Sequence, residues 1–242
     1  MIEIKEGAFV VSDAHYSHFR PELLAFIREI HSKKLQPTQL ILMGDIFDTL
    51  FGGVPFSLEI NQELVKLINE ISTEIEVIYL EGNHDFNLAP LFPHAKIVPI
   101  SEQPLACGNS GRKVLLAHGD FNSDIGYRVY TALIRTPTVL TFLHLLNFLS
   151  FNLILKKLDA YLSKKEDCKE FRGFEQFISK RLAGKYTCDY FVEGHFHQNK
   201  SLKLDTFTYI NLGAFACNQR YFIVKSPNEV ELLEEKIFSK GI

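Results

Sequence analysis

The chain has 242 residues, of which 46% are hydrophobic, and this length suits one domain with an insertion better than two independent domains. Its net charge of −3 excludes a broad basic surface, so we expect no nucleic-acid partner. The four cysteines lack paired spacing, which argues against a disulfide framework or a zinc ribbon. The opening residues, MIEIKEGAFVVSD, lack the pattern of a secretion signal, so we expect a cytoplasmic, reducing location.

Short runs rich in β-branched and aromatic residues alternate with amphipathic stretches along the chain. Helices are predicted at Pro21–Lys34 and Glu59–Ser72, and Leu24, Ile27 and Ile30 share one face of the first. This alternation predicts layers of helices and sheets. The predicted strands are Ala8–Ser12, Gln39–Met43, Glu76–Leu80, Lys113–Ala117, Tyr190–Val192 and Phe207–Asn211.

Each of the first five predicted strands runs directly into a polar cluster at its C-terminal end. Carboxylates and imidazoles beside apolar strands are costly to bury unless something satisfies them, and divalent cations do so. Strand ends are rigid supports, so the clusters can converge on one rim of a sheet. The glycines before Asp45, Asn83 and His195 let the backbone turn and approach closely. The clusters are Asp13-Ala14-His15, Gly44-Asp45-Ile46-Phe47-Asp48, Gly82-Asn83-His84-Asp85, His118-Gly119-Asp120 and Gly194-His195-Phe196-His197.

Each cluster also has an ordinary interpretation. A single Asp-x-His or His-x-His is common by chance, and Gly-Asn-His-Asp can be a simple turn. Five clusters in this order, all at strand ends, are difficult to explain as core histidines, so together they predict a metal site. The mixture of nitrogen and oxygen ligands favours manganese, iron, zinc or cobalt over calcium or magnesium, without choosing among the first four.

The series Asp-x-His, Gly-Asp-x-x-Asp, Gly-Asn-His-Asp, His and Gly-His-x-His resembles the signature of the calcineurin-like metallophosphoesterases, and it spans most of the chain. The resemblance implies an α+β fold, a four-layer α/β/β/α sandwich, and two divalent metal ions, with Mn²⁺ expected. The ligands that it implies are Asp13, His15 and His197 for the first metal, Asn83, His118 and His195 for the second, and Asp45 as the bridge.

The same resemblance assigns three further roles. His84 matches the family's histidine that faces the scissile phosphate, Asp85 would orient His84, and Asp48 would support a ligand without binding metal. Two cations about 3.5–4 Å apart lower the pKa of a bridging water and present hydroxide in line with the phosphorus. Whether His84 donates to a phosphoryl oxygen or protonates the leaving group stays open.

Between His118 and His195 lies a long segment with a helical pattern, and we expect one domain over residues 1–242 with a helical insertion at about 124–186. Thr136-Pro137 predicts a helix start, and an apolar run, Val139–Leu155, follows it. A membrane-spanning helix is disfavoured, because the run is short and one crossing would separate two ligands of one metal. A helix packed on the core and a lid over the site remain, and the lid is favoured because so wide an apolar surface is hard to cover. Acyl chains would then pack on Leu140, Phe142, Leu143, Leu146 and Phe148, and anionic headgroups would meet Lys156, Lys157, Lys164 and Lys165.

This layout resembles the bacterial UDP-2,3-diacylglucosamine hydrolases. The resemblance implies cleavage of a lipid-linked nucleotide, UDP-2,3-diacylglucosamine, to UMP and 2,3-diacylglucosamine 1-phosphate in lipid A biosynthesis, by a protein held peripherally at the inner membrane. One departure is that the commonest branch has Arg where this chain has His84, and the insertion is shorter. The residues that the resemblance assigns to the substrate pocket are Phe86, Asp124, Tyr127 and Arg128.

Two other functions are compatible with parts of the sequence. A hydrolase of soluble nucleotides or phosphoproteins would carry the same motifs but would need no apolar insertion. A non-catalytic scaffold with the same fold would normally have lost ligands, whereas every ligand position is filled here. A nuclease is disfavoured by the acidic balance of charge.

Overall fold

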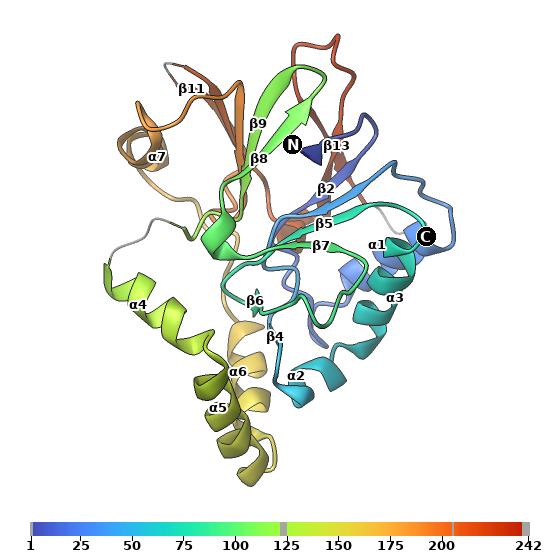
Figure 1. Cartoon of the computed structure of the whole chain (residues 1–242), viewed down its shortest axis with the longest axis vertical. Coiled ribbons are helices and arrows are strands. Elements are labelled where there is room, and N and C mark those ends of the chain that lie inside the picture. The colour runs from blue at the N-terminus through green and yellow to red at the C-terminus, as the bar shows by residue number, and fades with distance from the viewer. Residues whose placement is uncertain (1, 122–124, 205, 239–242) are drawn as a thin grey trace.

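The computed structural model describes residues 2–121, 125–204 and 206–238, and most of its strands form two mixed sheets (Figure 1). The first sheet contains, in spatial order, β14 (Leu233–Ile237), β13 (Arg220–Val224), β2 (Phe9–Val11), β3 (Leu40–Leu42), β5 (Val77–Leu80) and β7 (Lys96–Val98). The second contains β1 (Ile2–Glu3), β8 (Leu105–Asn109), β9 (Arg112–Ala117), β10 (Tyr190–Glu193), β12 (Thr208–Asn211) and β11 (Lys200–Lys203). A short third sheet pairs β4 (Leu50–Phe51) with β6 (Asp85–Phe86).

The helices are distributed along the whole chain. Those before β8 are α1 (Glu22–His31), α2 (Pro55–Glu59), α3 (Gln62–Ser72) and a 3₁₀ turn at Ile100–Glu102. Those after β9 are α4 (Ile125–Ile134), α5 (Pro137–Leu149), α6 (Leu153–Leu162), α7 (Phe174–Leu182) and α8 (Phe215–Asn218).

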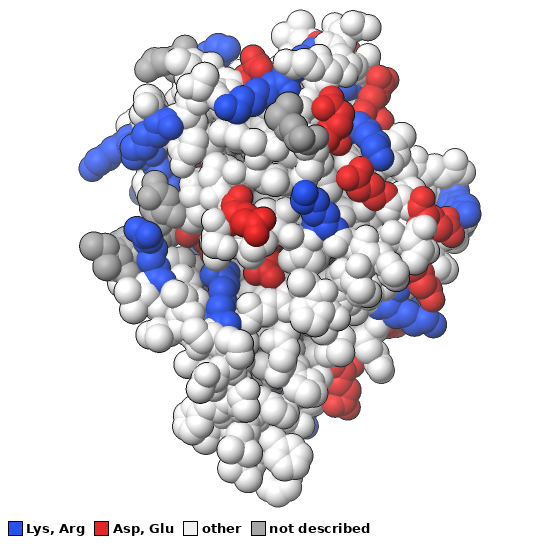
Figure 2. Space-filling view, in the orientation of Figure 1, with Lys and Arg blue, Asp and Glu red and all other residues white. Residues whose placement is uncertain are grey.

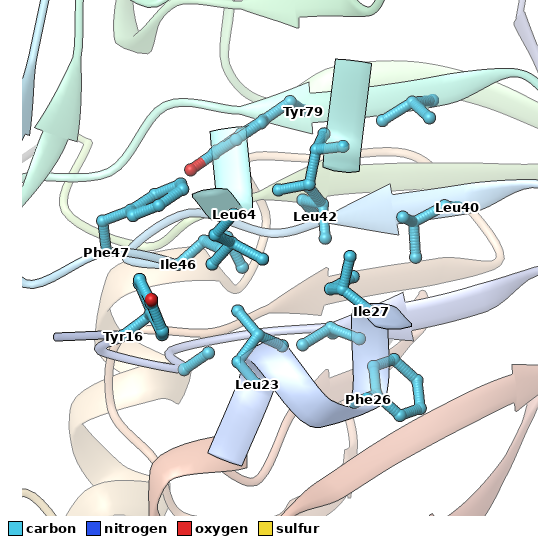
Figure 3. Packing of buried hydrophobic residues seen from close by; sticks show 14 of the residues in the cluster. Tyr16, Leu23, Phe26, Ile27, Leu40, Leu42, Ile46, Phe47, Leu64 and Tyr79 are labelled. Carbon is cyan, nitrogen blue, oxygen red and sulfur yellow. The ribbon is translucent and has the colours of Figure 1, made fainter. Parts of the chain in front are cut away.

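Three clusters of buried apolar side chains establish the order of the layers. One joins the first sheet to α1 and α3, where Leu42 packs in the same cluster as Phe26 (Figure 3). The neighbouring residue of β3, Ile41, points to the opposite face and belongs with Leu116 to a cluster between the two sheets. A third cluster joins the outer face of the second sheet to Phe174 of α7. The order helix, sheet, sheet, helix confirms the predicted four-layer fold.

The direction of the strands places the polar clusters. Strands β2, β3 and β5 run parallel to one another, and β9 runs parallel to β10. Their carboxyl ends therefore meet along a common edge of each sheet, and segments far apart in the sequence become neighbours there. The residues that follow these ends are Asp13 after β2, Asp45 after β3, Asn83 after β5, His118 after β9 and His195 after β10.

Each strand predicted from the sequence is present, with ends that differ by no more than one residue. The predicted helix Glu59–Ser72 is divided, because α2 ends at Glu59 and α3 begins at Gln62. Between them, the buried Asn61 side chain donates to the carbonyl oxygens of Thr49 and Ser57, each at 2.8 Å. Strands β13 and β14, which extend the first sheet beyond β2, were not predicted.

The apolar run Val139–Leu155 does not form the single helix that was predicted. Helix α5 ends at Leu149, and Phe151 and Asn152 adopt left-handed conformations with φ of 55° and 61° before α6 begins. The buried Asn147 side chain fixes this turn, because it donates to Asn152 Oδ1 at 2.8 Å and accepts from the Leu155 amide at 3.0 Å. The polar residues inside the run therefore make a helical hairpin.

The hairpin of α5 and α6 projects away from the two sheets (Figure 1), and its end shows almost no charged side chains on the face seen in Figure 2. Among the described residues, no single helix is long and apolar enough to cross a membrane, and α4 and α5 reach that length only as a pair bent by 69°. That residues 1–242 form a single domain with an insertion at about 124–186 stays a prediction, and its first residue, Asp124, lies outside the described residues.

Candidate metal centre

The structure brings the predicted ligands together where the strand ends meet. Three groups each have ligand atoms within 4.8 Å of one another, and neighbouring groups share a residue. Asn83, whose side chain contributes an oxygen, lies with its Oδ1 3.4 Å from His118 Nε2. All seven predicted ligands therefore converge from two sheets. The groups are Asp13 with His15 and His197, His15 with Asp45 and His84, and Asp45 with His118 and His195.

The backbone of the site is held in an unusual conformation. Five of its residues have φ between 48° and 61°, in the left-handed region that non-glycine residues seldom adopt. Such conformations cost free energy, so the surrounding structure must enforce them, and they concentrate at functional sites. Here they turn each side chain toward the common centre. The five residues are Asp13, His15, Asp45, His195 and His197.

Two of the glycines in the polar motifs, Gly44 and Gly194, allow close packing behind the ligands. A Cβ atom on Gly44, which has φ of 87°, would lie 2.5 Å from Nδ1 of His118. A Cβ atom on Gly194 would lie 2.0 Å from Oγ of Ser12 and 2.5 Å from the Asp13 carboxylate. Neither position has room for a side chain, so the motif glycines bring the ligands of the two sheets into contact.

The electrostatics of the centre fit bound cations. Burial opposes the charge of Asp13, but His197 outweighs it and lowers the pKa of Asp13 to about 2. Burial also opposes the charge of His118, yet the Asp45 carboxylate 3.4 Å away raises the His118 pKa well above its usual value. Burial and the charge of His118 lower the pKa of His195 to about 3. The carboxylates thus attract positive charge into the site, which divalent cations supply.

Two buried atoms give a more direct indication that cations fit. Within the described part of the chain, His15 Nε2 and Asp48 Oδ2 have no hydrogen-bond partner. Leaving such atoms unsatisfied costs roughly 1–3 kcal/mol each. His15 Nδ1 donates to Asp48 Oδ1 at 3.2 Å, which fixes the ring and leaves Nε2 free to face Asp13 and His197. A carboxylate behind a ligating histidine is the usual support for a metal ligand, as predicted for Asp48.

Asp85, which was predicted to orient His84, forms its hydrogen bonds with other groups. Its carboxylate accepts hydrogen bonds from the amides of Asp45 and Ile46 and from the Tyr79 hydroxyl, at 2.6 to 3.0 Å. Burial, and the nearby charge of Asp45, raise the pKa of Asp85 to about 7. The His84 ring is instead oriented through Nδ1, which lies 3.0 Å from the Asp48 carbonyl oxygen. Asp85 therefore holds the loop that carries Asp45.

Several supporting residues could not be found from the sequence motifs. Gln103 accepts from the His118 amide at 2.6 Å, and Asn211 donates to the Gly194 carbonyl at 2.6 Å. Arg181 of α7 forms a buried ion pair with Glu193, at 2.7 and 2.8 Å, and donates to the Gly119 carbonyl. Of these, only Asn211 had a signal, since it lies in Tyr209-Ile-Asn-Leu-Gly-Ala, a stretch that resembles the strand and turn after the last family motif.

Hydrogen bonds, an ion pair and a disulfide join the segment after α6 to the metal centre and the residues around it. The carbonyl of Asp167 accepts from His197 Nδ1 at 2.5 Å, and Arg20 pairs with the Asp167 carboxylate at 2.5 Å. Cys168 and Cys217 form a disulfide, so the expectation from cysteine spacing was wrong for this pair. Spacing could not reveal it, because Cys168 and Cys217 are 49 residues apart and only the fold brings α8 beside the insertion.

An apolar pocket of about 420 Å³ adjoins the centre. Of the predicted substrate residues, Phe86 and Tyr127 line it, Arg128 lines a second, more polar pocket, and Asp124 lies outside the described residues. Of the five residues predicted to pack on acyl chains, only Leu140 and Leu143 line the apolar pocket, whereas the other three lie outside its lining and are exposed. Its remaining lining includes Asp48, Asn83 and His84 on one side and Leu155 and Leu158 of α6 on the other.

Comparison with known families identifies the fold and the chemistry. The model of the family described as calcineurin-like phosphoesterase matches residues 8–199, from just before Asp13 to just after His197. The chain belongs to this family. The protein is therefore a metal-dependent phosphoesterase, a hydrolase, and the predicted family resemblance is confirmed. Two bound cations would activate water for attack on phosphorus. The seven predicted ligands of this phosphoesterase are the residues that would hold them.

Curated relatives of this phosphoesterase are distant but cover most of its length. It is 25% identical over 216 residues to a UDP-2,3-diacylglucosamine hydrolase of Histophilus somni, covering 85% of this chain and 90% of the relative. It is 24% identical over 226 residues to one of Haemophilus influenzae, covering 87% and 91%. It is 23% identical over 194 residues to one of Photorhabdus laumondii, covering 78% and 80%.

The solved structures that match this chain are more remote in sequence. A novel archaeal phosphodiesterase is 14% identical, with a TM-score of 0.47, and the match covers 96% of this chain and 99% of that one. A dimetal phosphatase from Danio rerio is 11% identical, with a TM-score of 0.44, covering 91% and 94%.

Proposed function

We propose that this phosphoesterase cleaves the pyrophosphate of UDP-2,3-diacylglucosamine to UMP and 2,3-diacylglucosamine 1-phosphate. The observation that carries the proposal is the apolar pocket that shares a wall with the metal centre. Asn83 and His84 line one side of it, and Leu140, Leu143 and Leu155 of the hairpin line the other. A substrate that places a phosphate at the metals and an acyl chain between these helices would match both the polar and the apolar side of the pocket.

The size of the apolar wall favours a lipid over a soluble nucleotide. Each CH₂ group that leaves water contributes about 0.8 kcal/mol, so an acyl chain in this pocket would supply a large share of the binding free energy. A soluble nucleotide or a phosphoprotein would leave the same wall without a partner. The relatives named UDP-2,3-diacylglucosamine hydrolase support the lipid substrate as well.

We also propose that the hairpin rests on the cytoplasmic surface of the inner membrane. Phe142, Phe148, Leu149 and Phe151 point away from the pocket, with 59%, 64%, 65% and 82% of their surface exposed. Apolar side chains gathered at one projecting end suit the boundary between headgroups and acyl chains, and the lysines of the insertion suit anionic headgroups. A protein held in this way would take its substrate from the bilayer.

The metal is proposed to be Mn²⁺, since nitrogen and oxygen ligands occur together, although iron, zinc and cobalt suit the same donors. The test uses Mn²⁺-loaded protein with UDP-2,3-diacylglucosamine in detergent micelles, with soluble nucleotide diesters and with a phosphopeptide, and identifies the products by mass. We expect UMP and 2,3-diacylglucosamine 1-phosphate to be the preferred products.

A variant of the pocket sharpens the same assay. Leu143→Asp places a charge against the acyl chain, so KM for the diacyl substrate should rise about tenfold or more, while hydrolysis of bis(p-nitrophenyl) phosphate changes little. Leu133→Asp is the control, because Leu133 is exposed on α4 and lies outside the pocket lining. Equal losses on both substrates, or a preference for a soluble ester, would overturn the lipid assignment.

A further inference from the structure

Arg135, directly after α4, carries a buried guanidinium whose hydrogen-bonding capacity is mostly unused. Only 10% of its side chain is exposed. Its Nη2 donates to the Gly82 carbonyl at 2.7 Å, and the nearest Asp120 oxygen is 4.0 Å away. Within the described part of the chain, Nε and Nη1 have no hydrogen-bond partner. Burying charged donors in this way is costly, so a ligand that accepts from them would relieve the cost.

The structure holds this guanidinium in place. Its carbon lies 5.0 Å from the centre of the Phe86 ring, and the Arg135 carbonyl accepts from the Asn87 side chain at 2.8 Å. With the bond to Gly82, these contacts fix both the backbone and the head of the side chain. A planar, preorganised guanidinium is well suited to bind a phosphate through two parallel hydrogen bonds.

Arg135 also lines two pockets, one of which adjoins the metal centre. Arg135 lines the apolar pocket together with Asn83 and His84, and it is the only lysine or arginine among the described residues of that lining. With Tyr127 and Thr131, which line both pockets, it also lines the second pocket, of about 990 Å³. A substrate that reaches from one pocket to the other passes Arg135, whose partner Gly82 directly precedes the candidate ligand Asn83.

Charge balance indicates which part of a substrate Arg135 would meet. Two divalent cations, two ligating carboxylates and one hydroxide leave a single positive charge, which one phosphate diester neutralises. A pyrophosphate diester brings a second negative phosphate, for which the metal ligands offer no counterion. The buried guanidinium next to Gly82 supplies positive charge at this position, where its existing ion pair with Asp120 is long, at 4.0 Å.

We propose that Arg135 binds the phosphate that is not attacked, and that this contact selects a pyrophosphate over a simple phosphodiester. The inference rests on the proposed function for the choice of a pyrophosphate substrate. It makes the insertion part of phosphate recognition as well as of lipid binding, and it places a specificity residue outside the family motifs.

The test compares two ligands that differ by one phosphate group. Metal-loaded protein is titrated by calorimetry with UMP and with uridine 5′-(α,β-methylene)diphosphate, which is not hydrolysed. Arg135→Met should weaken binding of the methylene diphosphate by about 10–100-fold and of UMP by less than about threefold. Arg172→Met, an exposed arginine of the same insertion, should change neither. Metal content is measured in each variant.

Arg135→Lys keeps the positive charge but removes the planar guanidinium and its paired donors. This variant replaces Arg135→Met in the test if the Met variant does not fold. It should bind the methylene diphosphate about threefold to tenfold more weakly than the wild type, with UMP unchanged. Equal weakening of both ligands, or of neither, would overturn the proposal and leave Arg135 as an anchor of the insertion. A protein that ignores UDP-2,3-diacylglucosamine but shows this Arg135-dependent preference would refute the proposed substrate alone.

Discussion

The metal centre and the helical hairpin of α5 and α6 are built in opposite ways. At the centre, Asp13 and His118 are fully buried, and hydrogen bonds from two sheets hold the loops around them. In the hairpin, most large apolar side chains are exposed, and its buried contact with the rest of the protein is a small cluster around Phe86 and Leu140. Chemistry that requires fixed ligand positions is thus separated from an exposed apolar surface.

The two regions meet at a few contacts. Arg20, Asp167 and the Cys168–Cys217 disulfide hold the end of the insertion beside His197, and Arg135 holds its beginning beside Gly82. We expect substitutions at these contacts to influence both catalysis and substrate choice, because the contacts touch ligand-bearing loops directly. Substitutions elsewhere should affect one region and leave the other unchanged.

The largest effect is expected at the metal ligands. Asp45→Asn or His118→Ala should lower kcat by more than about 10³-fold, because each removes a ligand and little core volume. Thermal unfolding should stay a single transition, and metal content, measured by elemental analysis, should fall. Either variant with full metal content and more than about a tenth of the wild-type activity would show that the ligand assignment is wrong.

A smaller loss is expected at His84, which lies at the centre but faces the pocket. If it contacts the phosphoryl group, His84→Ala should lower kcat by roughly 10²–10⁴-fold with metal content unchanged. The middle group of ligand atoms includes His84, so the alternative is direct metal binding. The loss of one metal equivalent would favour that alternative over phosphoryl contact.

The smallest effect is expected at the end of the hairpin. Phe148→Asp should weaken binding to vesicles of anionic phospholipid about tenfold, because a charge replaces an apolar side chain at the membrane boundary. Hydrolysis of bis(p-nitrophenyl) phosphate should be unchanged. Val230→Asp is the matched control, since Val230 is 92% exposed and lies before β14, far along the chain from the hairpin. Unchanged vesicle binding in Phe148→Asp would argue against membrane contact through this end.

The sequence determined the parts of the molecule that depend on local pattern. Buried strands such as Leu40–Leu42 are continuous apolar runs, and the polar motifs that follow them are local as well. Parallel strands must bring their carboxyl ends to one edge, so the convergence of Asp13, Asp45 and Asn83 followed from pattern and fold class together. The seven candidate metal ligands were predicted from the sequence in this way, and the structure brings them together.

Tertiary structure alone decided what depends on contacts between distant segments. Asp85 holds the Asp45 loop instead of His84, since the fold brings the Asp48 carbonyl to the His84 ring. The run Val139–Leu155 bends because the Asn147 side chain forms hydrogen bonds with Asn152 and the Leu155 amide across a turn. The spacing of apolar residues does not predict these hydrogen bonds. Arg135 is one charged residue among many in the sequence. Only burial beside Gly82, with two donors left unsatisfied, distinguishes it.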